Sequence, residues 1–335
     1  MKAISKRLKQ TYGNKTSLLC YCADIKNMYT SLPHDAIITA IDFILDRFKQ
    51  TKMGRRCKSG ISIEKYAHGS VLPGYTQNNS YITLKLTDIR RICVFDIRNA
   101  FFSCFGHILK QTVGVPMGSP GSPAYAICIC MYYEHIFNNK LTHLQKKLPN
   151  TNNGPLCEGL RYIDDLIAFF PFQKNDAISS TIAVLLKDYL SHNTYHPNML
   201  LKDEPITNNT FNFLETSVKY AGSTEFHIKH KDKNVHSLLH HNKLKKVKTI
   251  HASSFAPKPQ ATNIILNTLH RINDNCSSDA LKAIATIEQF FVATHFGYKK
   301  KHLHKALRKM FLSTNNKLWN SLTAALRPNF AHILS

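Results

Sequence analysis

The stretch RYIDDLIAFF, residues 161–170, places Asp164 and Asp165 between runs that are otherwise apolar and aromatic. The flanking residues predict two β-strands joined by a tight connection that holds both acids. Two like charges held side by side require a compensating cation, and a divalent metal ion is the common one. The stretch therefore predicts a hairpin whose turn binds metal.

Other segments must position these acids. SLLCYCAD, residues 17–24, predicts a buried strand ending at Asp24. Asp35 is expected to cap a helix whose apolar residues share one face, Ser122 to cap a second helix with Pro123 at its first position, and a third helix is expected near 177–190. FNFLETSVKY and EFHIKHK predict a further hairpin.

The order strand, helix, helix, hairpin, helix, strand indicates an α+β fold, a split β-α-β antiparallel sheet with helices on one face. In that arrangement Asp24 lies beside Asp164 and Asp165. Residues 50–80 are polar, basic and Gly-containing, and we expect an irregular insertion there, within a segment at about 50–110.

Composition narrows the class of partner. The chain has 335 residues, which predicts two substructures, and a formal net charge of +23, which points to nucleic acid or an anionic membrane surface. No apolar run approaches the ~20 residues that a membrane span needs, so no membrane partner is expected. Nine cysteines without a C-x-x-C spacing predict buried free thiols in a reducing compartment, the nucleus or the cytoplasm, rather than a zinc site.

The charge is concentrated late in the chain. Residues 226–310 hold 16 Lys and Arg against 4 Asp and Glu, an excess of 12. A solvated helical face is the simple interpretation, but such a face mixes signs, and the imbalance favours a surface that follows a phosphate backbone.

Four segments in order resemble the palm motifs of a reverse transcriptase, and in particular those of Penelope-like retroelements. They are DIKNMYTSLPHD (24–35), QTVGVPMGSPGSPAYA (111–126), RYIDDLIAFF and FNFLETSV (211–218). NVHSLLHHNKLKKVKTIHAS and FFVATHFGYKKKHL resemble the region that follows the palm. The resemblance implies a fingers remnant or entry strand at 1–23, a palm at 24–235 and a helical, basic, thumb-like region at 236–335.

The resemblance also implies the chemistry. Asp24 and Asp164 correspond to the main metal ligands, Asp165 to the third carboxylate, and the carbonyl of Ile25 also faces a metal. Two Mg²⁺ ions are expected, with Mn²⁺ as a substitute. One would lower the pKa of the attacking 3′-hydroxyl and the other would neutralise the departing pyrophosphate.

Three further positions correspond to the nucleotide site. Tyr29 matches the aromatic gate that favours deoxynucleotides, with a core tyrosine as the alternative. Met117 stands where many reverse transcriptases have Gln, although Met is familiar in the Penelope-like group. Gly118 would let the backbone pass close to the templating base pair; a plain helix entry would also explain this turn.

The expected partners are an RNA template, a DNA primer or RNA–DNA duplex, and dNTPs. The candidate nucleic-acid contacts are Lys243, Lys245, Lys246, Lys248 and Arg271. The predicted function is RNA-directed DNA polymerase. The alternatives are a retroelement-derived RNA-binding protein that no longer polymerises and, more remotely, a viral RNA-dependent RNA polymerase.

Two departures from the family pattern remain. Glu215 replaces the usual Asp after Phe-Leu. Only 23 residues precede Asp24, where the family carries a fingers subdomain. We therefore expect this chain by itself to bind primer-template well and to extend it poorly.

Overall fold

The computed structural model describes residues 1–13, 16–58, 60–65, 71–148, 154–220, 223–241, 243–244, 250–254 and 258–325. Two compact units are present, and each is described by itself. The central unit is Leu19–Glu204, and the terminal unit joins Met1–Leu18 to Pro205–Ser335.

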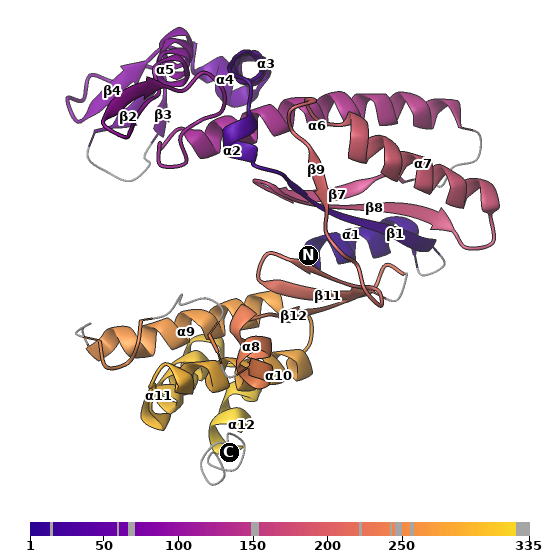
Figure 1. Ribbon diagram of the computed structural model, residues 1–335, viewed down its shortest axis with the longest axis vertical. Helices are drawn as coiled ribbons and strands as arrows, with labels where there is room; N and C mark the ends of the chain where they lie inside the picture. Colours follow the sequence, from indigo (N-terminus) through magenta and orange to yellow (C-terminus); the bar gives the residue numbers. More distant parts are fainter. Residues whose placement is uncertain are drawn as a thin grey trace. The chain divides into compact units, whose positions relative to one another are not determined.

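A four-stranded sheet in the order β7-β8-β1-β9 forms the centre of the central unit (Figure 1). Its strands are β1 (Thr16–Ile25), β7 (Glu158–Tyr162), β8 (Asp165–Gln173) and β9 (Leu201–Asp203). Strands β7 and β8 are antiparallel and pair Tyr162 with Asp165, which leaves Ile163 and Asp164 as the turn. The predicted hairpin is confirmed, with Asp165 as the first residue of β8.

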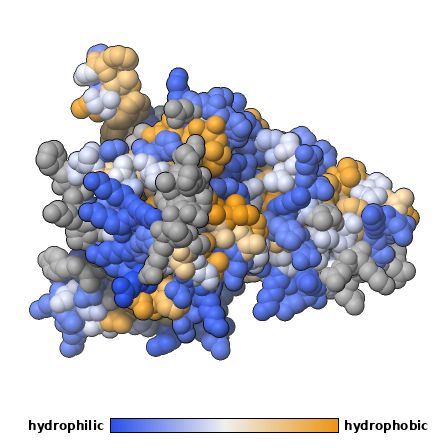
Figure 2. Space-filling view, turned by 90° about the horizontal axis from the view of Figure 1, so that it is seen from below, coloured by the Kyte–Doolittle hydropathy of each residue, from blue (hydrophilic) through white to orange (hydrophobic). Residues whose placement is uncertain are grey.

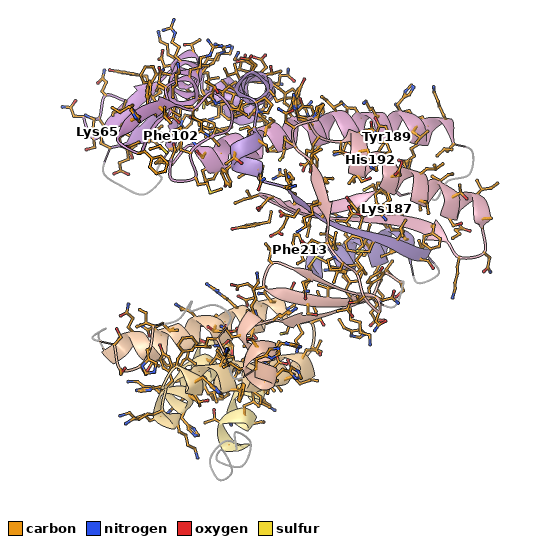
Figure 3. The ribbon with its side chains drawn as sticks, viewed as in Figure 1. Lys65, Phe102, Lys187, Tyr189, His192 and Phe213 are labelled. Carbon is orange, nitrogen blue, oxygen red and sulfur yellow. The ribbon has the colours of Figure 1, made fainter. Side chains whose placement is uncertain are left out.

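Helices cover this sheet, and Figure 1 shows α6 and α7 on the same side of it. These are α6 (Ser122–Lys147) and α7 (Ala177–Asn193), while α3 (His34–Gln50) packs on α6 and the short α2 (Met28–Ser31) follows β1. Ile37 of α3, Ile129 of α6 and Phe170 of β8 belong to one buried core. Side chains on α7 add contacts: Lys187 Nζ lies 5.5 Å from the ring centroid of Tyr21, and Tyr189 stacks on Phe137 at 6.0 Å (Figure 3).

Two predicted helix caps were wrong by one or two positions. Pro33 is the N-cap of α3, and Asp35 lies in its first turn. Gly121 is the N-cap of α6. Ser122 is the first helical residue, and its Oγ donates to the Pro116 carbonyl instead of capping the helix.

The described residues of the insertion form regular helices and strands, so the expectation of an irregular segment was wrong for them. It contains α4 (Lys52–Arg56), β2 (Ile61–Glu64), β3 (Val71–Pro73), β4 (Tyr81–Leu84), α5 (Leu86–Arg98), β5 (Phe101–Cys104) and β6 (His107–Lys110). Three strands form an antiparallel sheet in the order β3-β2-β4. Its register aligns Val71, Ile63 and Ile82 across the strands, and the buried Ser62 Oγ donates to the Gly74 carbonyl at 2.7 Å.

The terminal unit combines a three-stranded sheet with helices. Its elements are α1 (Lys2–Tyr12), β10 (Thr210–Phe213), β11 (Thr216–Tyr220), β12 (Phe226–His230), α8 (Lys233–His241), α9 (Lys258–Asn275), α10 (Asp279–His295), α11 (Lys300–Thr314) and α12 (Lys317–Ala325). Leu269, Phe290 and Trp319 are buried in its core. The strands β10–β12 belong to this unit, whereas the sequence analysis grouped them with the palm.

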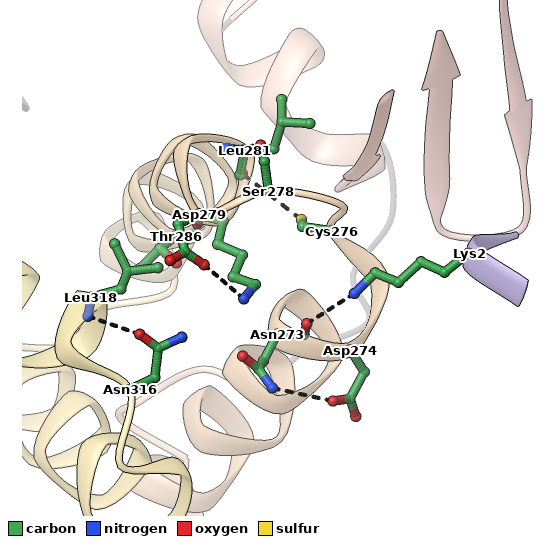
Figure 4. A network of polar contacts seen from close by, with 11 residues as sticks. Lys2, Asn273, Asp274, Cys276, Ser278, Asp279, Leu281, Thr286, Asn316 and Leu318 are labelled. Atoms are coloured by element: carbon green, nitrogen blue, oxygen red, sulfur yellow. Dashed lines mark hydrogen bonds and ion pairs between the residues drawn. The ribbon is translucent and has the colours of Figure 1, made fainter. Parts of the chain in front are cut away.

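Side-chain caps define several helix ends of the terminal unit (Figure 4). Ser278 Oγ accepts a hydrogen bond from the Leu281 N–H at the start of α10, and Asn316 Oδ1 accepts one from the Leu318 N–H at the start of α12. Lys2 Nζ donates to the Asn273 carbonyl at 3.3 Å and so ties α1 to α9.

The face of the molecule drawn in Figure 2 is mainly polar. Figure 2 shows hydrophilic residues over most of the face it draws, with smaller hydrophobic areas between them. All nine cysteines are free thiols and five of them are buried, in keeping with the prediction of free thiols. Within the described ranges, no helix combines the length and the apolar character that crossing a membrane would need.

Candidate active site

A backbone hydrogen bond brings two of the predicted acids together. Asp24 is the penultimate residue of β1, and Asp164 lies in the β7–β8 turn. The N–H of Ile25 donates to the carbonyl of Asp164 at 3.0 Å. The end of β1 and the turn of the neighbouring hairpin therefore meet, as the sequence predicted.

The charges at this junction affect one another. Asp24 is half-buried, and burial raises the pKa of its carboxyl above the usual range. The carboxylates of Asp164 and Glu204 raise it further, while Lys202, the partner of Asp24 across β1 and β9, opposes the rise. The negative potential at Asp24 is one that a bound cation would relieve.

The third acid, Asp165, follows Asp164 directly in the chain. Asp165 is half-buried at the start of β8. Across the described part of the chain, no group of three or more His, Cys, Asp and Glu side chains is arranged to hold a metal ion. Asp24 and Asp164 supply the oxygen donors that Mg²⁺ prefers. The place of Asp165 in a metal site stays a prediction.

Tyr29 lies within electrostatic reach of one of these acids, Asp164. Burial, together with Asp164 and Tyr162, raises the pKa of its phenol, which places the ring within electrostatic reach of Asp164. Its carbonyl accepts a hydrogen bond from the Val115 N–H at 2.6 Å. The segment before Met117 therefore supports the backbone of Tyr29. The predicted contact of Tyr29 with the nucleotide sugar stays a prediction.

Gly114 is a residue of this site that the sequence analysis missed. Its φ is +79°, and a Cβ there would lie 2.6 Å from the Tyr29 carbonyl oxygen and 2.7 Å from the Thr30 Cα. Its N–H donates to the Leu32 carbonyl at 2.8 Å. Only glycine fits this close approach of two backbones without strain.

Met117 and Gly118 lie in a more open environment. Met117 is 72% exposed, and a Cβ at Gly118 would meet no atom of the described chain within 4 Å. The structure thus leaves space around Gly118, and the predicted approach of the templating base pair to it stays a prediction.

The predicted nucleic-acid contacts fall in the terminal unit. Lys243 is exposed, whereas Lys245, Lys246 and Lys248 lie outside the described residues. Arg271 forms an ion pair with Glu215, with Nη1 and Oε2 separated by 3.0 Å. That pair links α9 to the β10–β11 turn. Phe213 is buried beside this turn, while Leu214 is 41% exposed (Figure 3).

Comparison with known proteins gives a fold. No protein-family model matches the chain, and no curated protein matches it. Telomerase from Candida albicans, solved with the TWJ fragment of telomeric RNA, aligns with a TM-score of 0.55 and 12% identity over 99% of this chain and 52% of that chain. Telomerase is a reverse transcriptase.

The chain has a reverse-transcriptase-like fold.

Two structures of telomerase from Candida tropicalis also align over 99% of this chain at 12% identity. The apo structure has a TM-score of 0.47 over 44% of that chain, and the complex with the TWJ fragment has 0.45 over 43%. This chain spans about half the length of these telomerase chains. At 12% sequence identity, the likeness to telomerase shows a similar fold and does not show a shared activity.

Proposed function

We propose that the chain is an RNA-directed DNA polymerase of a Penelope-like retroelement. The observation that carries the proposal is the junction of Asp24 with the Asp164 turn, and the reverse-transcriptase-like fold and the order of the four sequence motifs support metal ligands at this position. RNA is the proposed template, and the telomerase of similar fold was solved with an RNA fragment.

Different residues of the proposed site would bind the metal ions, the nucleotide and the duplex. Asp24 and Asp164 would hold Mg²⁺, with Asp165 as a third ligand. Bound there, the ions would supply positive charge for the 3′-hydroxyl and for the departing pyrophosphate. The Ile25 amide fixes the turn of Asp164 against β1. Tyr29 would close the sugar side of the nucleotide site, and the basic terminal unit would hold the primer-template duplex.

One observation favours a second function. Residues 226–310 carry an excess of 12 basic over acidic side chains, and a protein that kept the fold and charge and lost polymerisation would show this excess as well. That protein would bind RNA and extend nothing.

Primer extension on an RNA template, with dNTPs and Mg²⁺, separates the two functions. Extension by the parent chain supports the polymerase, and tight RNA binding without extension supports the binding protein. Asp164→Asn should abolish extension and leave RNA affinity nearly unchanged, because the lost charge is local. Asp46→Asn is the matched control, since this exposed carboxylate on α3 pairs only with Lys49 at 2.8 Å in the described contacts.

A further inference from the structure

Arg161 joins helix α6 to the turn that carries Asp164. Its side chain, near the end of β7, is only 9% exposed, and a guanidinium so buried is costly unless it is paired. Nε and Nη2 both donate to the carboxylate of Glu134 on α6, with Nη2 and Oε2 separated by 3.4 Å. Nη1 donates to the carbonyl of Ile163 at 3.1 Å.

The carboxylate of Glu134 also accepts a hydrogen bond from a residue other than Arg161. The hydroxyl of the buried Tyr195 donates to Glu134 Oε1 at 2.8 Å. Cys130 lies one helical turn before Glu134, and burial raises the pKa of its thiol to about 12. Arg161 opposes that rise, whereas Glu134 and Asp164 add to it, so these groups surround one buried position.

The turn needs such support. Ile163 has a φ of +56°, a left-handed conformation that costs a β-branched residue free energy and persists only where the surroundings impose it. Its carbonyl is held by Arg161, and the next carbonyl, of Asp164, is held by the Ile25 N–H. Two consecutive carbonyls of the turn therefore accept hydrogen bonds, one from the Arg161 side chain on β7 and one from the Ile25 N–H on β1.

We infer that Arg161, held by Glu134 and Tyr195, is a positioning residue that fixes the β7–β8 turn so that Asp164 stays beside Asp24. The planar guanidinium presents its donors in a fixed fork that bonds a carboxylate and a carbonyl at once, and a lysine ammonium cannot reproduce this geometry. The effect on catalysis rests on the proposed polymerase function, whereas the effect on the turn does not.

The test compares Arg161→Lys with Arg90→Lys. Arg90 forms the same kind of two-bond pair, with Asp42, but at an exposed place on α5. Amide hydrogen exchange measured at Ile25 reports the turn, and the amides of Ile167 to Phe169 report the rest of the hairpin. Steady-state primer extension gives kcat and the dNTP KM.

Arg161→Lys should speed exchange at Ile25 about tenfold and leave the β8 amides unchanged, because the lost hydrogen bond acts on the turn alone. A displaced Asp164 should lower kcat by about 10- to 100-fold. The dNTP KM should change less than about twofold, since the bound ground state is unaltered. Arg90→Lys should change none of these.

Several outcomes overturn the inference. Unchanged exchange at Ile25, or equally faster exchange throughout β8, would show that Arg161 stabilises the fold without positioning the turn. If Arg161→Lys does not fold, Tyr195→Phe decides: faster exchange at Ile25 supports the inference, and unchanged exchange overturns it. A parent chain that extends no primer would refute the proposed function, and the exchange measurement would still decide the role of Arg161.

Discussion

Gly114→Ala tests whether the segment before Met117 supports Tyr29. Gly114 and Gly106 have nearly the same φ, +79° and +80°, in the region that favours glycine. Their surroundings differ. A Cβ at Gly114 would meet the backbone of Tyr29 and Thr30 at 2.6 and 2.7 Å, whereas a Cβ at Gly106 would meet nothing within 4 Å. The pair therefore separates the cost of conformation from the cost of close approach.

The two costs have different sizes. An alanine in the left-handed region costs about 1–2 kcal/mol, and both variants pay that cost. A contact of 2.6 Å with backbone atoms forces a shift of one of the two segments, which adds about 1–3 kcal/mol of overpacking. We expect Gly106→Ala to lower the free energy of unfolding by about 1–2 kcal/mol and Gly114→Ala by about 2–5 kcal/mol.

Urea unfolding measures the difference. Amide exchange in β8 follows the central unit through the transition, and the fluorescence of Trp319, the single tryptophan, follows the terminal unit. Gly114→Ala should lower the urea concentration at which the central unit unfolds and leave the unfolding of the terminal unit unchanged. Equal loss of stability in the two variants would refute the close approach.

Three further predictions concern other residues. Tyr29→Val should raise ribonucleotide incorporation relative to the parent, because removing the ring makes room for a 2′-hydroxyl, and equal discrimination in competition assays would return Tyr29 to a core role. Burial lowers the pKa of His230, so the unfolded chain takes up a proton at this residue at higher pH than the folded chain, and the stability of the terminal unit should fall as the pH drops below about 6.5. In His230→Gln, the stability measured by Trp319 fluorescence should depend less on pH. Replacing four lysines with glutamine should flatten the salt dependence of primer-template affinity by up to about 3.6 in log-log slope, and an unchanged slope would mean that they are merely solvated. The four are Lys243, Lys245, Lys246 and Lys248.

The sequence predicted what depends on local pattern. The hairpin of residues 161–170 was predictable because apolar residues flank a polar pair on both sides. The meeting of Asp24 with Asp164 followed from the order of strands and helices. Both features are set by residues close in sequence or by general rules of sheet topology.

What the sequence did not predict depends on contacts between distant segments. The strands β2–β4 have only three or four residues each, and their apolar residues align only through the register, so the local sequence pattern does not predict them. Arg161 contacts Glu134 and Glu134 contacts Tyr195 across 27 and 61 positions. The close approach at Gly114 likewise exists only in the folded chain.

The most direct test of the central claim is templated single-nucleotide addition. The chain is given one DNA primer, four RNA templates that differ only in the next base, Mg²⁺, and each dNTP in turn. The account predicts that each template selects its complementary dNTP, and that Asp164→Asn adds none while Asp46→Asn adds normally. Tight binding of all four duplexes with no addition, or addition that ignores the template base, would contradict it.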